Sequence, residues 1–177
     1  VFHKHNSIGL RLEDLKNHPH KTLPALCEWM GIKEEPSLYQ MTAQGKKYWG
    51  NPSSPDFEKN AMNPFDGASI NRKIGAIFSI KDQYILNTLF YPFRVSFGYT
   101  EENHKKFLKD LKAIHPMLDQ MFDFEIKIGK KDAIDPKEFM QSGSFQYLHS
   151  GLIERWNTLN EFQIYPNMVK PLKIPGI

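Results

Sequence analysis

The stretch from residue 8 to residue 31 reads IGLRLEDLKNHPHKTLPALCEWMG, and it decides the expected fold. Its first part, Ile8–Leu12, is short and apolar and ends at two acidic residues. That pattern is typical of a buried strand whose polar residues emerge at its carboxyl end. Apolar residues then recur at helical spacing between Leu23 and Met30, and Gly31 is suited to a left-handed helix cap. The stretch therefore predicts a strand followed by a helix.

Prolines and caps set the expected ends of the next elements. Pro24 is compatible with the first helix only in its first turn, with Thr22 near the N-cap. Residues 42–70 are rich in Gly, Pro and Asn and predict an irregular connection, which in a compact domain is often a lid or binding loop. Ser79 is expected to cap a helix through Leu89, with Asp82 at the third position, and Pro92 is expected to end or bend it.

Residues 101–177 are expected to be mostly helical. Two apolar stripes at helical spacing indicate helices, and Pro116 is expected to kink the first of them. Between the stripes, Phe124–Ile128 alternates like a short edge strand closed by Gly129, and the tail from Tyr165 is expected to run extended. We therefore expect two parts, 1–100 and 101–177. The stripes consist of Phe107, Leu111, Ile114 and Leu118, and of Leu148, Leu152, Ile153, Trp156 and Leu159.

The composition is that of a folded protein. Of 177 residues, 40% are hydrophobic and 13% aromatic, which argues against disorder. The net charge of +3 is spread along the chain and is too weak a field to indicate a nucleic-acid protein. The single cysteine, Cys27, excludes an internal disulfide and is expected to be a buried, inert thiol. Because no apolar run is long enough to span a membrane and no signal sequence opens the chain, we expect a cytoplasmic protein.

The titratable residues give no convincing metal or nucleophile pattern. His3 and His5, like His18 and His20, are spaced two apart without carboxylate or cysteine partners, so solvated histidines are expected. His149 lies beside an apolar stripe and is expected to be partly buried with its hydrogen bonds satisfied. There is no Walker-type or Gly-x-Gly-x-x-Gly loop, so phosphates are not expected to be cradled in that way.

One loop does suit an anion. Arg72 offers a planar fork, Lys73 adds a point charge, and Gly75 allows close backbone approach. Two adjacent basic residues in a loop are also commonly just solvated. Tyr48 and Trp49, in the long connection, could stack on a ring or simply hold the loop against the core.

Two ordered segments resemble the sulfotransferase superfamily. Leu10–Pro19, continuing to Gly31, is similar to the family's strand ending in Tyr-Glu-Asp-Leu, its turn and its helix ending in Phe-Leu-Gly. Arg72–Gly75, Phe78–Asp82 and then Gly98-Tyr99 are similar to its basic loop, its Leu-Ser-x-Glu-Asp helix start and its closing Gly-Tyr. The likeness covers roughly residues 8–100, and residues 101–177 would be a helical extension.

The resemblance implies an α/β fold of the P-loop-type sulfotransferase kind, this chain being its mostly helical carboxyl-terminal part with few strands. It implies transfer of a sulfuryl group from 3′-phosphoadenosine 5′-phosphosulfate to a hydroxyl or amine. Arg72, Lys73 and Gly75 would then hold the 3′-phosphate, which adenosine 3′,5′-bisphosphate also carries, and Tyr48 and Trp49 would line the acceptor pocket.

The partners implied are a small-molecule or glycan acceptor and the amino-terminal half of the same protein. That half would supply the phosphosulfate loop and the catalytic base, so this chain alone is expected to be inactive, with no metal, no nucleic acid and no membrane span. The sequence leaves a homo-oligomer open.

Two other interpretations stay open. One is a non-catalytic helical interaction module derived from the same fold, which would fit the replacement of a family tyrosine by Leu12 and the lack of a family tryptophan near Ile74. The other is a nucleotide- or nucleic-acid-binding module that uses the Arg72-Lys73 loop with Tyr48 and Trp49. A nucleic-acid-binding module of this kind should bind single-stranded nucleic acid with an affinity that depends strongly on salt concentration.

Overall fold

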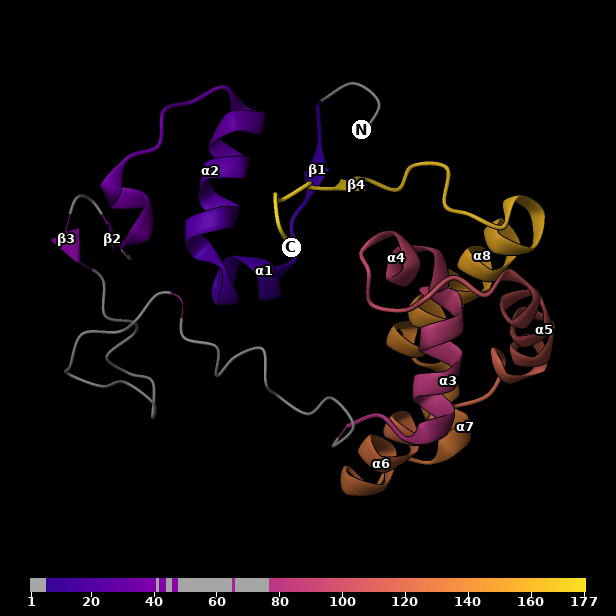
Figure 1. Cartoon of the computed structure of the whole chain (residues 1–177). Helices are drawn as coiled ribbons and strands as arrows, with labels where there is room; N and C mark the ends of the chain where they lie inside the picture. Colours follow the sequence, from indigo (N-terminus) through magenta and orange to yellow (C-terminus); the bar gives the residue numbers. More distant parts are fainter. Residues whose placement is uncertain (1–5, 41, 44–45, 48–64, 66–76) are drawn as a thin grey trace. The chain divides into compact units, whose positions relative to one another are not determined.

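A computed structural model describes residues 6–40, 42–43, 46–47, 65 and 77–177 (Figure 1). The chain forms two compact units. One, which we call the helical unit, has residues 77–168 as its described part; the other, the terminal unit, combines the described residues before position 73 with residues 169–177. Residue 100, near which we expected a boundary, lies inside the helical unit, where α3 (Ile80–Leu89) packs against both α5 (His104–Ile114) and α8 (Gly143–Phe162).

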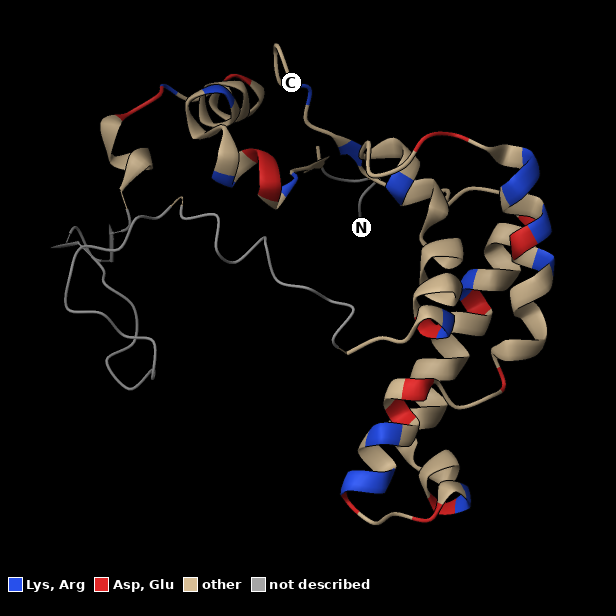
Figure 2. Ribbon diagram, turned by 60° about the horizontal axis from the view of Figure 1, so that its bottom comes forward, with Lys and Arg blue, Asp and Glu red and all other residues tan. Residues whose placement is uncertain are grey.

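The helical unit is built from helices joined by short connections, and the colours of the ribbon in Figure 2 show that acidic and basic residues are interspersed along them. No helix of the described residues is long and apolar enough to cross a membrane. The helices are α3 (Ile80–Leu89), α4 (Tyr91–Ser96), α5 (His104–Ile114), a 3-10 helix (His115–Met117), α6 (Asp123–Lys131), α7 (Pro136–Gln141) and α8 (Gly143–Phe162).

The core of this unit confirms the first predicted apolar stripe and most of the second, of which Leu148 is 38% exposed and lies outside the core. Phe107, Leu111 and Ile114 of α5 are at most 2% exposed. Leu152 and Leu159 of α8 pack into the same cluster, together with apolar residues of α3. Each such side chain contributes roughly 1.5–3 kcal/mol through burial. The kink expected at Pro116 is instead the end of the helix: α5 ends at Ile114, and Pro116 lies in the 3-10 helix that follows directly.

The predicted start of α3 is confirmed. The Ser79 hydroxyl accepts a hydrogen bond from the Asp82 amide at 3.1 Å, and the Asp82 carboxylate accepts one from the Ser79 amide at 3.2 Å. This reciprocal capping box satisfies two backbone donors that a helix start leaves unpaired. The helix ends at Leu89, and Pro92 lies in the first turn of α4, as expected from its fixed φ.

The predicted edge strand at Phe124–Ile128 is wrong, because these residues belong to α6. Gly129 is buried inside that helix and closes no strand. The helix start is capped by carboxylates: Glu125 accepts from the Phe122 amide at 2.7 Å, and Asp82 accepts from the next two amides. With its first donors satisfied, the segment is more stable as a helix than as an isolated edge strand.

The terminal unit contains a short parallel pair of strands. Ile8 is paired with Lys170, and Gly9 with Pro171, so the expected strand is only two residues long and the tail runs extended beside it. The expected strand end at Leu12 is instead the first residue of a helix. The elements are β1 (Ile8–Gly9), α1 (Leu12–Asn17), α2 (Pro19–Met30), a 3-10 helix (Pro36–Tyr39), the antiparallel β2 (Thr42–Ala43) and β3 (Lys46–Lys47), and β4 (Lys170–Pro171).

The helix predicted to end at Gly31 is α2, and Gly31 has the expected left-handed φ of 67°. The position predicted for Pro24 is wrong: α2 begins earlier, at Pro19, and Pro24 lies inside it. Thr22 is buried within the helix rather than near its start, and its hydroxyl donates to the Asp14 carbonyl at 2.9 Å. A proline at this point, beyond the first turn, removes one backbone hydrogen bond of the helix. Cys27 is buried, as expected.

Two glycine substitutions should have opposite effects on stability. Gly31→Ala should lower the free energy of unfolding of the terminal unit by about 1 kcal/mol, because a Cβ meets nothing there within 4 Å but the φ of 67° is strained for alanine. Gly151 lies inside α8, and a Cβ added there also meets nothing within 4 Å. Gly151→Ala should therefore raise the free energy of unfolding of the helical unit by roughly 0.5–1 kcal/mol. Urea unfolding followed by circular dichroism measures both. A stabilising Gly31→Ala would contradict the role of its backbone conformation.

Candidate functional site

The residues predicted to bind the donor and the acceptor lie outside the described residues. These are Arg72, Lys73 and Gly75 of the basic loop, and Tyr48 and Trp49 of the long connection. Their assigned roles stay predictions. The described chain resumes at Ile77, three residues before the first helical residue of α3, so the basic loop precedes a firmly capped helix.

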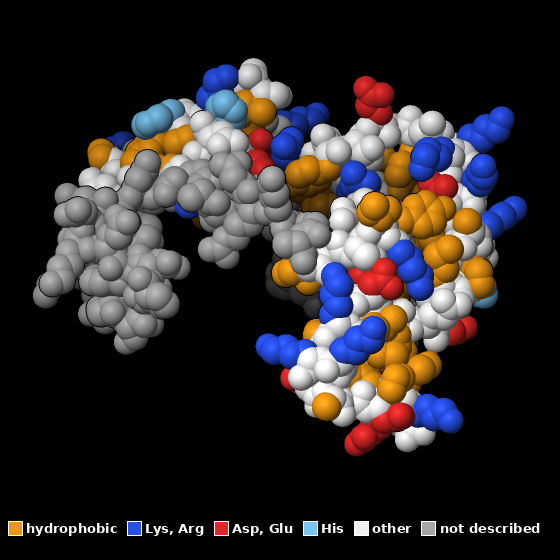
Figure 3. Space-filling model, turned by 90° about the horizontal axis from the view of Figure 1, so that it is seen from below, with side chains coloured by type: hydrophobic (Ala, Val, Ile, Leu, Met, Phe, Trp, Pro, Cys, Tyr) orange, Lys and Arg blue, Asp and Glu red, His pale blue; other side chains and the backbone are white. Residues whose placement is uncertain are grey.

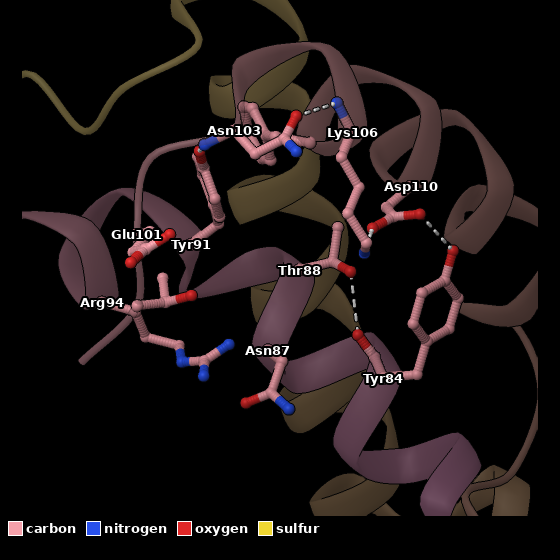
Figure 4. A pocket seen from close by; sticks show the side chains of 11 residues that line it. Tyr84, Asn87, Thr88, Tyr91, Arg94, Glu101, Asn103, Lys106 and Asp110 are labelled. Atoms are coloured by element: carbon pink, nitrogen blue, oxygen red, sulfur yellow. Dashed lines mark hydrogen bonds and ion pairs between the residues drawn. The ribbon is translucent and has the colours of Figure 1, made fainter.

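Within the helical unit, the structure shows a pocket of about 240 Å³ that sequence reasoning missed. Its walls come from α3, α4, the connection after α4 and α5 (Figure 4). The lining residues are Tyr84, Asn87, Thr88, Tyr91, Arg94, Thr100, Glu101, Asn103, Lys106, Phe107 and Asp110. The signal that could have found it is the recurrence of Tyr84, Thr88 and Tyr91 on one side of the α3–α4 segment.

Capping contacts hold the walls in place. The Asn103 side chain accepts a hydrogen bond from the Lys106 backbone amide at 3.0 Å and so caps α5. The backbone amide of Asn103 donates to the Tyr91 hydroxyl. This contact fastens the connection before α5 to α4. The Tyr91 ring stacks on the buried Phe107 ring with centroids 4.5 Å apart, which gives the pocket a rigid aromatic wall.

One of the two cations in the pocket is neutralised. Lys106 forms an ion pair with Asp110 one turn further along α5, and the Tyr84 hydroxyl donates to Asp110 at 3.1 Å (Figure 4). Burial, together with the hydrogen bond to Asp110 and the charge of that carboxylate, raises the pKa of Tyr84 above its usual 10.0. The phenol therefore stays protonated and keeps donating to Asp110 throughout the physiological pH range.

The other cation is unpaired. The half-buried Arg94 guanidinium has no hydrogen-bond or ion-pair partner among the residues that the structure describes, although the Arg94 carbonyl accepts from the Tyr99 amide at 2.7 Å. Figure 4 shows its side chain reaching toward Asn87, across the pocket from Tyr84. A guanidinium beside an aromatic wall is chemically suited to pair with an anion rather than to activate a nucleophile.

A buried histidine–carboxylate pair lies elsewhere in this unit. His149 Nε2 is 3.0 Å from Glu125 Oε2, and His149 Nδ1 is 2.6 Å from the Leu118 carbonyl oxygen. Both side chains are under 5% exposed, and neither lines the pocket of Figure 4. Because a substrate could not reach the ring nitrogens, the pair is structural. The expectation that the hydrogen bonds of His149 are satisfied is confirmed, and the residue is more deeply buried than the partial burial that we expected.

Over the described ranges, no group of three or more His, Cys, Asp or Glu side chains is arranged to hold a metal ion. Comparisons of this chain with protein-family models, curated proteins and solved structures found no match.

Proposed function

We propose that this chain is the carboxyl-terminal part of a sulfotransferase that uses 3′-phosphoadenosine 5′-phosphosulfate and transfers its sulfuryl group to a hydroxyl or amine. The observation that carries the proposal is local. Each segment that resembles the family keeps one predicted helix end: α2 ends at Gly31 in the left-handed conformation, and α3 begins with the Ser79–Asp82 capping box. The strand predicted in the first segment is shortened to Ile8–Gly9, because α1 begins at Leu12. The short parallel pairing of β1 supports an α/β origin.

In this proposal the basic loop binds the 3′-phosphate of the donor. Arg72 provides two parallel N–H donors and Lys73 a compact charge, and charge-assisted hydrogen bonds of this kind contribute roughly 1.5–3 kcal/mol each. Gly75 lets the backbone approach the phosphate. Tyr48 and Trp49 contribute an aromatic wall to the acceptor pocket.

The proposal also assigns the remaining chemistry to residues outside this chain. Sulfuryl transfer requires in-line placement of the acceptor, a base for its proton and cations for the leaving oxygen. Of these requirements, the basic loop of this chain supplies only some of the groups that hold the donor. We therefore infer that the chain by itself does not turn over substrate.

Binding of adenosine 3′,5′-bisphosphate tests the proposal. The nucleotide is titrated calorimetrically into the full-length protein and into this chain. In the full-length protein, Arg72→Ala or Lys73→Ala should weaken binding about tenfold or more, as expected for the loss of a hydrogen bond to a charged group. Lys127→Ala, which removes an exposed charge on α6, is the matched control and should bind like the unaltered protein.

The opposite outcome has a clear meaning. If the full-length protein does not bind the nucleotide, the non-catalytic interaction module becomes the better interpretation. One observation favours that second candidate: Ile80 and Tyr147 of the helical unit are 88% and 84% exposed, and Figure 3 shows hydrophobic side chains between the basic ones on one face. Exposed apolar surface of this kind is typical of contact with another protein.

A further inference from the structure

The pocket between α3, α4 and α5 contains a guanidinium, that of Arg94, which no residue in the described part of the chain pairs with, and it lies beside aromatic rings. Nothing in the proposed sulfuryl transfer uses this pocket. We propose that this pocket binds a small organic monocarboxylate, held by a two-pronged hydrogen bond from the Arg94 guanidinium. The inference is independent of the proposed function, because every residue that carries it lies in α3, α4, α5 or the connection between α4 and α5.

Arg94 is the residue that selects the anion. Its planar fork matches the two oxygens of a carboxylate, and no described residue already occupies it. The backbone of Arg94 is fixed, since its carbonyl accepts from Tyr99 across a turn in which Gly98 has a φ of 70°. A guanidinium on a fixed backbone loses less conformational entropy when it binds a ligand.

The other charges of the pocket favour a single negative charge on the ligand. Lys106 is neutralised by Asp110, so Arg94 alone remains to balance an anion. Glu101, an exposed carboxylate on the same rim, disfavours a second negative charge. A dianion such as sulfate or hydrogen phosphate is therefore a poorer ligand than a monocarboxylate.

The size and walls of the pocket favour an organic body of about one ring. At about 240 Å³ it is smaller than the roughly 300–1,000 Å³ of typical drug-sized sites, which suits a small ligand. Phe107 and Tyr91 form an apolar wall for a ring. Glu101 can accept a hydrogen bond from a hydroxyl on the ligand.

The experiment follows backbone amide shifts by NMR while para-hydroxybenzoate, benzoate or inorganic sulfate is titrated into this chain. The two carboxylates should give saturable shifts confined to residues 84–110, with dissociation constants on the order of 1 mM. Para-hydroxybenzoate should bind more tightly than benzoate because its hydroxyl can donate to Glu101. Sulfate should bind at least about tenfold more weakly, because its second charge faces Glu101.

Arg94→Gln should weaken carboxylate binding about tenfold or more, and Arg94→Lys, which keeps the charge without the fork, should fall between it and the unaltered protein. Lys112→Gln, an exposed cation on α5 outside the pocket, is the control and should not change the affinity. Arg72→Ala should also leave the carboxylate affinity unchanged. A failure of the carboxylate proposal can therefore be distinguished from a failure of the proposed binding of the 3′-phosphate by the basic loop. Absence of saturable shifts, unchanged affinity in Arg94→Gln, or sulfate binding as tightly as benzoate would each overturn the proposal.

Discussion

Replacing Asp82 with asparagine should lower the free energy of unfolding of the helical unit by about 3 kcal/mol, as expected when a buried carboxylate that accepts several hydrogen bonds loses its charge and one acceptor. Asp82 is fully buried, although it belongs to the first turn of a helix, where aspartate is usually exposed. Urea or guanidinium unfolding followed by circular dichroism measures the change.

The large effect follows from the number of donors that converge on one side chain. Asp82 Oδ1 accepts from the Asp123 amide at 2.9 Å, and Oδ2 accepts from the amides of Ser79 at 3.2 Å and Phe124 at 3.1 Å. The carboxylate thus caps the amino-terminal ends of α3 and α6 together, where the partial positive charge of each helix favours an anion. An asparagine amide group would place its own hydrogens against at least one of these donors.

The matched control is Asp119→Asn, which makes the same chemical change at an exposed position and should alter stability by less than about 0.5 kcal/mol. Hydrogen exchange at the Asp123 and Phe124 amides should accelerate in Asp82→Asn, since their acceptor is lost. If Asp82→Asn matched the control in both measurements, the carboxylate would not be the joint between α3 and α6.

Elements whose signals are local could be predicted from the sequence. The capping box of α3 needs only Ser79 and Asp82, three residues apart, and the αL cap of α2 needs only Gly31. The stripes of α5 and α8 follow the helical period over several turns. In each case the residues that determine the structure are neighbours along the chain, so their pattern is sufficient.

Elements that depend on distant contacts could not be predicted in this way. Phe124–Ile128 alternates apolar and charged residues, and over five positions that pattern fits a strand as well as a turn and a half of helix. The helix is favoured by Asp82, 41 residues before the amide of Asp123 that it accepts from. Likewise, Leu12 begins a helix rather than ending a strand, because the partner of β1 is only two residues long and comes from the tail.

The candidate sites divide along the same line. The Arg72-Lys73 loop was found through its motif, whereas the pocket around Arg94 has no motif, because it brings together residues from three helices and the connection between α4 and α5. A lone arginine such as Arg94 carries no local signal. It becomes informative only when the structure shows Lys106 paired with Asp110 and Arg94 unpaired beside them.

His149→Ala should lower the free energy of unfolding of the helical unit by about 3–5 kcal/mol, the effect expected when a buried, ring-sized side chain with a buried hydrogen-bond partner is removed. The substitution leaves the Glu125 carboxyl group, which is 3% exposed, without its partner. It also leaves a cavity between two aromatic rings. The imidazole stacks on the Phe145 ring with centroids 3.9 Å apart and meets the Phe122 ring edge-on with centroids 5.4 Å apart.

Glu125→Gln should cost much less, about 1 kcal/mol. The Leu118 carbonyl can only accept, so His149 Nδ1 carries a hydrogen, and Nε2 of a neutral ring is then free to accept from the glutamine amide. The glutamine oxygen can still accept from the Phe122 amide, which Glu125 does at 2.7 Å. The hydrogen-bond network therefore survives this change with every group satisfied.

The double variant separates the two contributions to the His149→Ala effect. An unpaired amide is less costly to bury than an unpaired carboxylate, so adding Glu125→Gln to His149→Ala should recover roughly 1–2 kcal/mol rather than lower stability further. Denaturant unfolding of the four proteins gives this coupling energy directly. Strict additivity would instead assign the whole effect of His149→Ala to the lost ring packing and remove the electrostatic role from the pair.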